Sequence, residues 1–343
     1  MAQVRFAVVG CGVMGNQHSR NVFEHPGAQL VRLIDIDRAR AQSLAAGYSN
    51  VPASTDFQDA LRDDIDAVVL AVPHALHREY SIAAMRAGKH VMIEKPISVS
   101  EPEALDMIEA SRQCKRILQV GHVLRFYPAN LLIRQIAQSG QLGRLFQVRY
   151  HAEHFPDLSR RMWMAGPDEG GVIIGGAIHH TDLLAWWAGP IRAVRAYGQT
   201  IRPMYLQTHM HDHALIVYEF ASGATGESCY SVSTHSKGLP YTEAMLSFEY
   251  GTVILTAGTG DIHLNNQAPV LQYEPGTHKI QASNDWGVGL QNELEAFLAA
   301  LAGEPLRITP EEALYAIRVA VAARRSAEAS EPGVRVEVPA MQP

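Results

Sequence analysis

The chain carries the sequence Gly10-Cys11-Gly12-Val13-Met14-Gly15 between an apolar, β-branched run at residues 4–9 and an amphipathic segment. In this context a GxGxxG pattern indicates a dinucleotide-binding turn. The glycines permit a tight turn close to a pyrophosphate, and the start of the following helix offers N–H groups to it. The turn therefore predicts a βαβ unit. Its expected cofactor contacts are Gly10, Gly12, Val13, Met14 and Gly15.

A carboxylate stands at the end of the next apolar run. Asp35 comes twenty residues after Gly15, where an acidic side chain can hold the ribose hydroxyls of the adenosine half. We count its neighbour Ile36 as a second contact. The charge of Asp35 would repel the 2′-phosphate of NADP, so NAD is the expected cofactor. Arg38 and Arg40 could neutralise that phosphate, which leaves NADP as the less favoured alternative.

The first third of the chain alternates short apolar runs with amphipathic segments, as βαβ units of a parallel sheet do. Strands are expected near residues 4–9, 29–35, 66–72, 89–93 and 116–120. A chain of 343 residues is longer than one hydrophobic core usually organises. The alternation of short apolar runs and amphipathic segments also ends after Gly121. We therefore predict an NAD(P)-binding Rossmann domain at residues 1–122 and a substrate-binding and oligomerisation domain at residues 123–343.

The later part of the chain predicts a second sheet. Alternating apolar and polar runs lie at residues 191–200, 211–220, 224–234, 241–250 and 252–257, as in antiparallel strands. Helices near 178–188, 288–302 and 310–328 can cover one face of this sheet. The fold class is thus α/β, with a Rossmann domain and an α/β domain built on a large, mostly antiparallel open sheet. We expect its free face to join a homodimer or homotetramer.

Composition excludes several function classes. A formal net charge of −6 gives no electrostatic reason to expect nucleic acid. No apolar run reaches the roughly 18 residues that span a bilayer, and no export signal is visible. The three cysteines are widely spaced, which argues against a disulfide framework. A cytoplasmic protein without a membrane partner is expected.

A lysine follows the apolar run at residues 89–93, within Glu94-Lys95-Pro96. Ligands of doubly wound sheets bind beyond the carboxyl ends of the strands. Lys95 is therefore expected to reach whatever lies against the nucleotide.

The order and spacing of several motifs resemble those of the Gfo/Idh/MocA oxidoreductase family. The motifs are the glycine turn, Val72-Pro73-His74-Ala75-Leu76-His77, Glu94-Lys95-Pro96, Gly121-His122 through Arg125-Phe126 and Pro128, and Gly170-Gly171 leading to His179-His180-Thr181-Asp182. The resemblance covers nearly the whole chain. It implies oxidation of a secondary alcohol of a sugar or cyclitol, or the reverse reduction, with the substrate held against the nicotinamide.

The resemblance also implies roles for single residues. Lys95 matches the catalytic lysine, Glu94 lies by the nicotinamide ribose, and His179 matches the acid/base histidine of inositol dehydrogenase-like members. Further cofactor contacts would be Val72, Pro73, His77, His122 and Trp163, the last with a core position as its alternative. Further substrate contacts would be His122 and His180, while Arg161 could bind a substrate carboxylate or phosphate or lie in a solvated loop.

The chemistry points to the same pair. Oxidising an alcohol requires a hydride acceptor, a group that takes the hydroxyl proton, and charge that stabilises a developing alkoxide. We assign the proton to His179 and the charge to Lys95, and the two roles could be shared or exchanged. The family pattern places an aspartate four residues before this histidine, where this chain has Gly175. His180, Asp182 or a group from another segment could compensate.

A metal site is the weaker reading of the histidine-rich stretch His209-Met210-His211-Asp212-His213. On a strand, residues 209, 211 and 213 would share a face that could hold a transition metal. A polar lining of the substrate cleft is favoured, and no metal is expected.

Two other functions remain open on the same fold. Some relatives retain NAD and use transient oxidation to cleave a glycoside or drive an elimination without net redox change. Others sense the dinucleotide and act as regulators without catalysis, since fold alone does not settle function.

Overall fold

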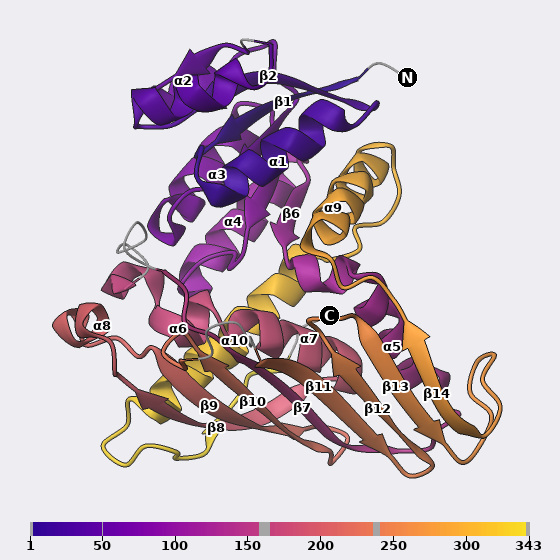
Figure 1. The fold of residues 1–343 in the computed structure, drawn as a ribbon. Coiled ribbons are helices and arrows are strands. Elements are labelled where there is room, and N and C mark those ends of the chain that lie inside the picture. Colours follow the sequence, from indigo (N-terminus) through magenta and orange to yellow (C-terminus); the bar gives the residue numbers. More distant parts are fainter. Residues whose placement is uncertain (1–2, 50, 158–164, 236–240, 341–343) are drawn as a thin grey trace. The chain divides into compact units, whose positions relative to one another are not determined.

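The computed structural model describes residues 3–49, 51–157, 165–235 and 241–340. These residues form two compact units, most of whose helices and strands are labelled in Figure 1. Unit 1 comprises residues 1–123 and 290–314, and unit 2 comprises residues 124–289 and 315–343. The sequence placed residues 290–314 in the second domain. They join unit 1 because Leu294 and Phe297 are buried in its core.

Unit 1 is built on a six-stranded sheet in the order β3-β2-β1-β4-β5-β6, in which every pair is parallel. The strands are β1 (Val4–Val9), β2 (Ala28–Ile34), β3 (Ala53–Ser54), β4 (Ala67–Leu70), β5 (His90–Glu94) and β6 (Leu118–Gly121). This is the strand order of a dinucleotide-binding Rossmann domain. The predicted parallel sheet is confirmed, with β3 as an added edge strand.

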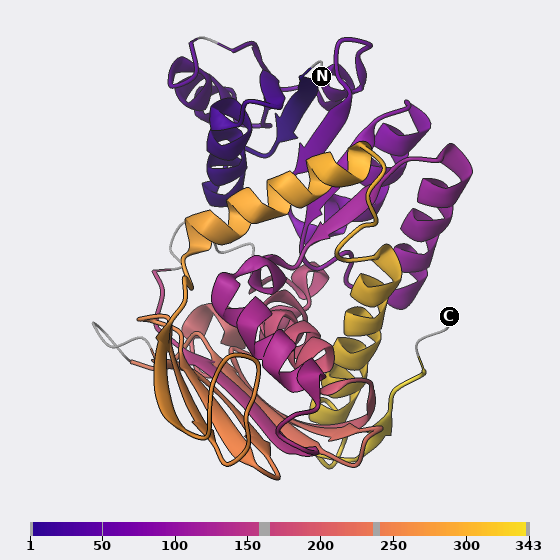
Figure 2. The same cartoon turned by 90° about the vertical axis from the view of Figure 1, so that its right-hand side faces the viewer.

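Helices cover both faces of this sheet. They are α1 (Val13–Glu24), α2 (Arg38–Ala46), α3 (His77–Arg86), α4 (Glu101–Cys114) and the part of α9 (Trp286–Leu301) that belongs to this unit. Unit 1 also contains two short 3₁₀ helices, η1 (Phe57–Leu61) and η2 (His74–Leu76). Figure 2 shows α9, in orange, along the strands of unit 1, where the ring of Phe297 lies 5.9 Å from that of Phe6.

Unit 2 is built on a nine-stranded sheet in the order β14-β13-β12-β11-β7-β10-β9-β8-β15. Only the β7–β10 pair is parallel among the described strands, so the predicted large, mostly antiparallel sheet is confirmed. The strands are β7 (Leu145–Glu153), β8 (Ile191–Gln199), β9 (His213–Phe220), β10 (Thr225–Ser231), β11 (Tyr241–Phe248), β12 (Gly251–Thr256), β13 (Asp261–Asn266), β14 (Gly276–Gln281) and β15 (Val336–Glu337).

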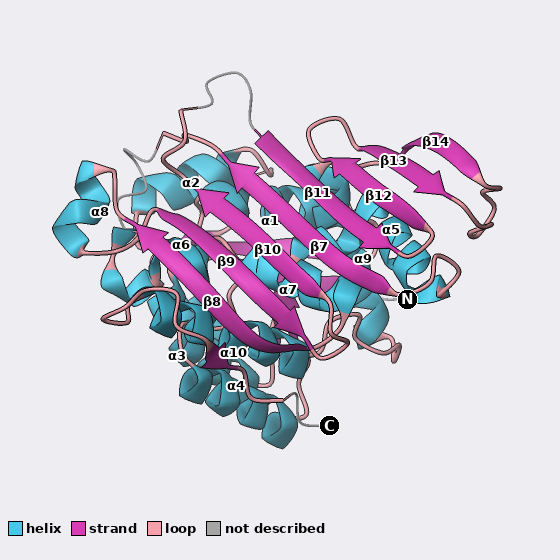
Figure 3. Cartoon of the chain, turned by 90° about the horizontal axis from the view of Figure 1, so that it is seen from below, coloured by secondary structure: helices cyan, strands magenta, loops and turns pink. Residues whose placement is uncertain are grey.

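The helices of unit 2 pack on one face of its sheet, and Figure 3 shows the opposite face toward the viewer. They are α5 (Pro128–Ser139), α6 (Gly171–Gly175), α7 (Ile178–Ala188), α8 (Pro203–Thr208) and the later part of α10 (Pro310–Ala327), with the 3₁₀ helices η3 (Val123–Phe126) and η5 (Pro167–Glu169). Strand β9 shows the alternation clearly: Ala214, Ile216 and Tyr218 are buried, whereas His213 and Leu215 are half-buried. One face thus makes the core, and none of the described helices packs on the other.

Within the described ranges, no helix is long and apolar enough to cross a bilayer.

Candidate active site

The glycine turn joins β1 to α1, and two of its glycines are required by the protein itself. Gly10 has φ +89°, and a Cβ there would lie 2.2 Å from the carbonyl oxygen of Ala71. A Cβ at Gly15 would lie 1.7 Å from the carbonyl oxygen of Gly10. A Cβ at Gly12 would meet no heavy atom within 4 Å, and no side chain caps the start of α1. The open side of the turn is therefore at Gly12, where helix N–H groups can receive an anion.

Asp35 follows β2 and is bound to the same turn. One carboxylate oxygen accepts the N–H of Cys11 at 2.7 Å, and the other accepts the N–H of Asp37 at 2.8 Å. Arg40 lies 3.3 Å from both oxygens. Asp35 is buried, whereas the next side chain, Ile36, is 88% exposed. The structure thus brings the carboxylate and the glycine turn together, as the spacing predicted.

Arg40 already contacts two carboxylates. Its guanidinium lies 3.3 Å from Asp35 and 3.4 Å from Asp37. Its positive charge is therefore partly compensated within the loop that follows β2, which leaves less of it for a 2′-phosphate.

Glu94, the last residue of β5, bonds to a histidine of α1. His18 Nε2 lies 2.8 Å from Glu94 Oε1, and His18 is buried. Burial opposes ionisation of Glu94, but the hydrogen bond from His18 and the positive charge of Lys95 outweigh it and hold the pKa of Glu94 below its usual range. Lys95 is half-buried. A carboxylate, an imidazole and an ammonium group are thus gathered at the carboxyl end of β5.

His18 was missed in the sequence. Its one signal is helical spacing, because residues 15, 18 and 22 of α1 share the face that the structure buries.

His77 links the loops that follow β4 and β5. Nδ1 lies 2.8 Å from the carbonyl oxygen of Pro96, and Nε2 lies 3.1 Å from that of Val72. Burial, aided by the charge of His74, lowers the pKa of His77 to about 4. The ring is therefore neutral at neutral pH and donates to one of the two carbonyls. Because the protein engages both nitrogens, these contacts give His77 a supporting role, and the direct cofactor contact stays a prediction.

Other predicted cofactor residues lie at neighbouring strand ends. Val72 follows β4, and its Cγ1 would lie 3.3 Å from a Cβ at Gly10. Pro73 comes next and is the N-cap residue of η2. His122 follows β6, whose last residue, Gly121, pairs with Glu94 across the sheet. His122 is buried.

His179 lies in the first turn of α7, in unit 2, and is half-buried. Its backbone N–H donates to the carbonyl oxygen of Gly176 at 3.2 Å. A Cβ at Gly176 would lie 2.3 Å from the ring of Tyr230, so this close approach requires a glycine. Gly175, which replaces the family's aspartate, ends α6.

His180 packs into the core of unit 2. Its ring centroid lies 4.4 Å from that of Tyr150 and 5.3 Å from that of Tyr230. Burial lowers the pKa of His180 to about 3, so the ring is neutral at physiological pH. This environment favours packing, and the predicted substrate contact of His180 stays a prediction.

Asp182 holds a buried arginine. Its two carboxylate oxygens accept from Arg125 Nε at 2.8 Å and Nη2 at 2.6 Å, and both side chains are buried. The Arg125 guanidinium also lies 5.6 Å from the ring centroid of Trp186. A buried carboxylate in such a bidentate pair is a structural group. The suggestion that Asp182 replaces the aspartate missing at position 175 is therefore not supported.

The histidine-rich stretch does not form the expected strand. His209 ends α8 with φ +56°, and β9 begins only at His213. Asp212 organises the turn by accepting the N–H groups of Ile201 and Arg202. The prediction that these histidines share one strand face, on which the metal hypothesis rested, is therefore wrong. Within the described ranges, no three His, Cys, Asp or Glu side chains are grouped as metal ligands. Trp163 and Arg161 lie outside the described residues.

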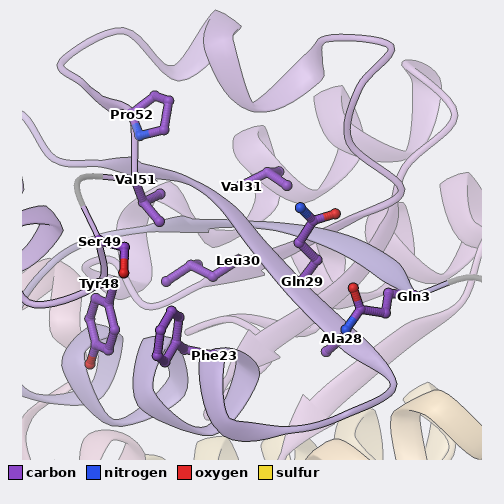
Figure 4. Close-up of a pocket in the computed structure, with 10 residues that line it drawn as sticks. All are labelled: Gln3, Phe23, Ala28, Gln29, Leu30, Val31, Tyr48, Ser49, Val51 and Pro52. Atoms are coloured by element: carbon purple, nitrogen blue, oxygen red, sulfur yellow. The ribbon is translucent and has the colours of Figure 1, made fainter.

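A cavity of about 470 Å³ opens elsewhere in unit 1. Figure 4 shows its lining, which includes Phe23 at the end of α1, residues 28–31 at the start of β2, and Tyr48. Because Asp35 and the glycine turn lie at the opposite, carboxyl end of these strands, this cavity is not part of the nucleotide site.

Comparisons with known proteins agree with this geometry. The family model described as oxidoreductase family, NAD-binding Rossmann fold, matches residues 4–122, and that of the GFO/IDH/MocA C-terminal domain matches residues 131–254. An inositol 2-dehydrogenase 2 of Saccharopolyspora erythraea is 28% identical over 318 residues, which cover 89% of this chain and 87% of the relative.

Two further relatives differ in how much they share. The 4-carboxy-2-hydroxymuconate-6-semialdehyde dehydrogenase of a Sphingobium species is 32% identical over 206 residues, and the match spans 58% of this chain and 64% of that relative. A levoglucosan dehydrogenase, solved with NADH and levoglucosan, has the same fold with a TM-score of 0.87 at 21% identity, covering 98% of this chain and 99% of that one.

The two matching family models together span residues 4–122 and 131–254, which is most of the chain. The chain therefore belongs to the Gfo/Idh/MocA family of oxidoreductases, and its residues 4–122 are the NAD-binding Rossmann domain of that family.

Proposed function

We propose that the protein transfers a hydride between NAD and a secondary hydroxyl or ketone of a sugar, a sugar derivative or a cyclitol. The observation that carries this proposal is the cluster of three side chains at the carboxyl end of β5. There Glu94 is hydrogen-bonded to His18, and the positive charge of Lys95 helps to lower the pKa of Glu94. Parallel sheets bind their ligands at this end. The family membership and the inositol and levoglucosan dehydrogenases among the similar proteins support the substrate class.

The reaction divides into two transfers. The C–H bond of the alcohol carbon breaks and its electron pair leaves as hydride to the nicotinamide, while the O–H bond breaks and its proton goes to a base. The Lys95 ammonium stabilises the oxygen as negative charge develops on it. His179 takes the proton, since an imidazole has the basicity for this step near neutral pH.

Cofactor binding follows from unit 1. The pyrophosphate would lie at Gly12 and the start of α1, and Asp35 would accept hydrogen bonds from the adenosine ribose. The exposed apolar side chains of Val13 and Ile36, 58% and 88% exposed, supply surface beside the nucleotide. His122 is proposed as a contact near the nicotinamide. Trp163 and Arg161 remain proposals from the sequence alone.

The free face of the nine-stranded sheet is the proposed interface of a homodimer or homotetramer. Side chains on this face mix charge and apolar surface, as Arg149, Met245 and Glu227 do on adjacent strands. Light scattering after gel filtration gives the number of subunits. A charge placed at Leu215, on the face without helices, should dissociate the assembly.

A redox-neutral reaction is the second candidate, and Gly175 favours it. The family's aspartate is absent from that position, and Asp182 is committed to Arg125. An altered acid/base arrangement suits an enzyme that retains NAD and uses transient oxidation.

The test is a screen of sugars, inositols and their keto derivatives, followed by NADH absorbance. A substrate-dependent change in NADH supports net hydride transfer. Product formed without added NAD and without a change in NADH supports the redox-neutral candidate. NAD binding with no turnover of any compound supports a sensing role and overturns both.

A further inference from the structure

A carboxyl group stands on the apolar face of α9. Leu290, Leu294 and Phe297 on this face are buried in unit 1, and Glu293, one turn from each end of this set, is 0% exposed. Glutamate is almost never buried so fully unless it is paired. The position of Glu293 therefore calls for a specific role.

The carboxyl group of Glu293 lies at the ligand-binding end of the sheet. Its Oε1 is 3.3 Å from the place that a Cβ would take at Gly121, the last residue of β6, and the same Cβ would lie 3.4 Å from the Cα of Glu94. The backbone carbonyl of Glu293 accepts the Nε2–H of Gln119 at 3.0 Å. The glycine at position 121 thus leaves room for this carboxyl group beside the β5 end.

Neither carboxyl oxygen of Glu293 has a hydrogen-bond partner among the residues that the structure describes. The titratable groups to consider are Glu94, whose charge acts on Glu293, His18 and Lys95, which act on Glu94, and His122, which follows Gly121 in the chain. Burial, and then the negative charge of Glu94, raise the pKa of Glu293 well above its usual range. Of two carboxyl groups this close, one keeps its proton, and Glu94 is the ionised one because His18 bonds to it.

We propose that Glu293 is a positioning residue which, as an uncharged carboxyl group, supports the backbone at Gly121 and Glu94 in the conformation that receives the nicotinamide half of NAD. Ionisation of Glu293 places a second negative charge close to the Glu94 carboxylate, and the repulsion between the two loosens that conformation. This inference rests on the proposed function, because it concerns the same nicotinamide site.

The direction of the pH effect follows from linkage. A group whose pKa is raised on folding contributes stability that is fully present below its unfolded pKa, about 4.5 for glutamate, and is lost as the pH rises through the folded value. The free energy of unfolding should therefore decline toward alkaline pH as Glu293 ionises. NADH affinity should decline with it, because the proposed conformation at Gly121 and Glu94 is loosened. A glutamine at position 293 cannot ionise and removes this decline.

The experiment compares the wild type with Glu293→Gln and Glu293→Leu between about pH 5 and about pH 9. NADH binding is followed by its fluorescence, and thermal unfolding of the protein without cofactor is measured over the same range. Glu293→Gln should bind NADH within about threefold of the wild type below the alkaline decline and should lack that decline. Glu293→Leu should fold and bind NADH about tenfold more weakly at every pH, because the branched side chain does not reproduce the shape of the carboxyl group beside Gly121.

The outcomes separate this inference from the function on which it rests. A wild type that does not bind NADH overturns the proposed function and this inference together. A wild type that binds NADH, with the alkaline decline unchanged in Glu293→Gln or with full affinity in Glu293→Leu, overturns the inference alone.

Discussion

His18 and Glu94 form a buried pair, with Nε2 of one 2.8 Å from Oε1 of the other, although 76 residues separate them in the chain. The pair joins the helix that begins at the glycine turn to the strand end that carries Lys95. It therefore connects the part of unit 1 proposed to hold the pyrophosphate with the part proposed to work at the nicotinamide.

Removing His18 should weaken cofactor binding. In His18→Ala the Glu94 carboxylate loses its hydrogen bond, which costs about 2 kcal/mol for a nearly buried charged group and corresponds to roughly 30-fold in NADH affinity if the bound state alone bears it. Calorimetric titration with NADH measures this. His263→Ala, which removes an exposed histidine of β13, is the matched control and should bind as the wild type does.

The same pair predicts an acid limit. Because the pKa of Glu94 is lowered on folding, its stability contribution is present above about pH 4.5, the unfolded value, and is lost as the pH falls through the folded value. Below that pH, the midpoint temperature of thermal unfolding should fall less steeply with decreasing pH in His18→Ala than in the wild type. An identical slope in the two proteins would show that the pair does not set the ionisation of Glu94.

Two glycines of the turn should respond differently to alanine. Gly12→Ala meets no neighbouring atom within 4 Å, so the protein should fold normally and lose NADH affinity because the methyl group occupies the phosphate side. Gly15→Ala places a Cβ 1.7 Å from the Gly10 carbonyl oxygen and should lower the free energy of unfolding by more than about 2 kcal/mol. Denaturant unfolding and NADH titration of both variants check this, and equal effects on stability would contradict it.

Asp35 should control the choice between NAD and NADP. Asp35→Ser removes the charge that opposes a 2′-phosphate and frees Arg40 from its nearest carboxylate. We expect about a tenfold loss of NAD affinity and a gain for NADP. Asp37→Ser is the control, because serine can still cap α2. An unchanged ratio of the two affinities in Asp35→Ser would place the ribose elsewhere.

Breaking the buried ion pair of Arg125 and Asp182 should lower the free energy of unfolding. Arg125→Met leaves the Asp182 carboxylate buried without its cation, which costs about 3–5 kcal/mol. The double variant with Asp182→Leu should recover much of this loss, since the uncompensated charge is gone. Urea unfolding measures both. Arg20→Met breaks the exposed pair with Glu24 and should leave the unfolding midpoint nearly unchanged. No recovery in the double variant would argue against a charge-pair origin.

The parts of the site that local spacing determines could be predicted from the sequence. The turn at residues 10–15 and Asp35 belong to a single βαβ unit, made of β1, α1 and β2, and the structure joins them through the Cys11 N–H. The Gfo/Idh/MocA resemblance, carried by motif order, was confirmed by the family models.

The contacts that sequence could not supply are those between distant segments. His18 meets Glu94, and Arg125 meets Asp182, only because the topology brings separate elements together. The alternation at His209, His211 and His213 failed for a local reason, since a left-handed residue ends α8 before the strand begins. Residues 290–314 joined unit 1 because the buried face of α9 completes its core.

The central claim is that Lys95 supplies the positive charge for hydride transfer to NAD. The most direct measurement is the rate of NADH formation or consumption by the wild type and Lys95→Ala, with the substrate found in the screen, alongside NADH binding by each. We predict that Lys95→Ala binds NADH within a few-fold of the wild type and turns over at least about 10³-fold more slowly. A variant that binds NADH and keeps wild-type turnover would contradict the claim.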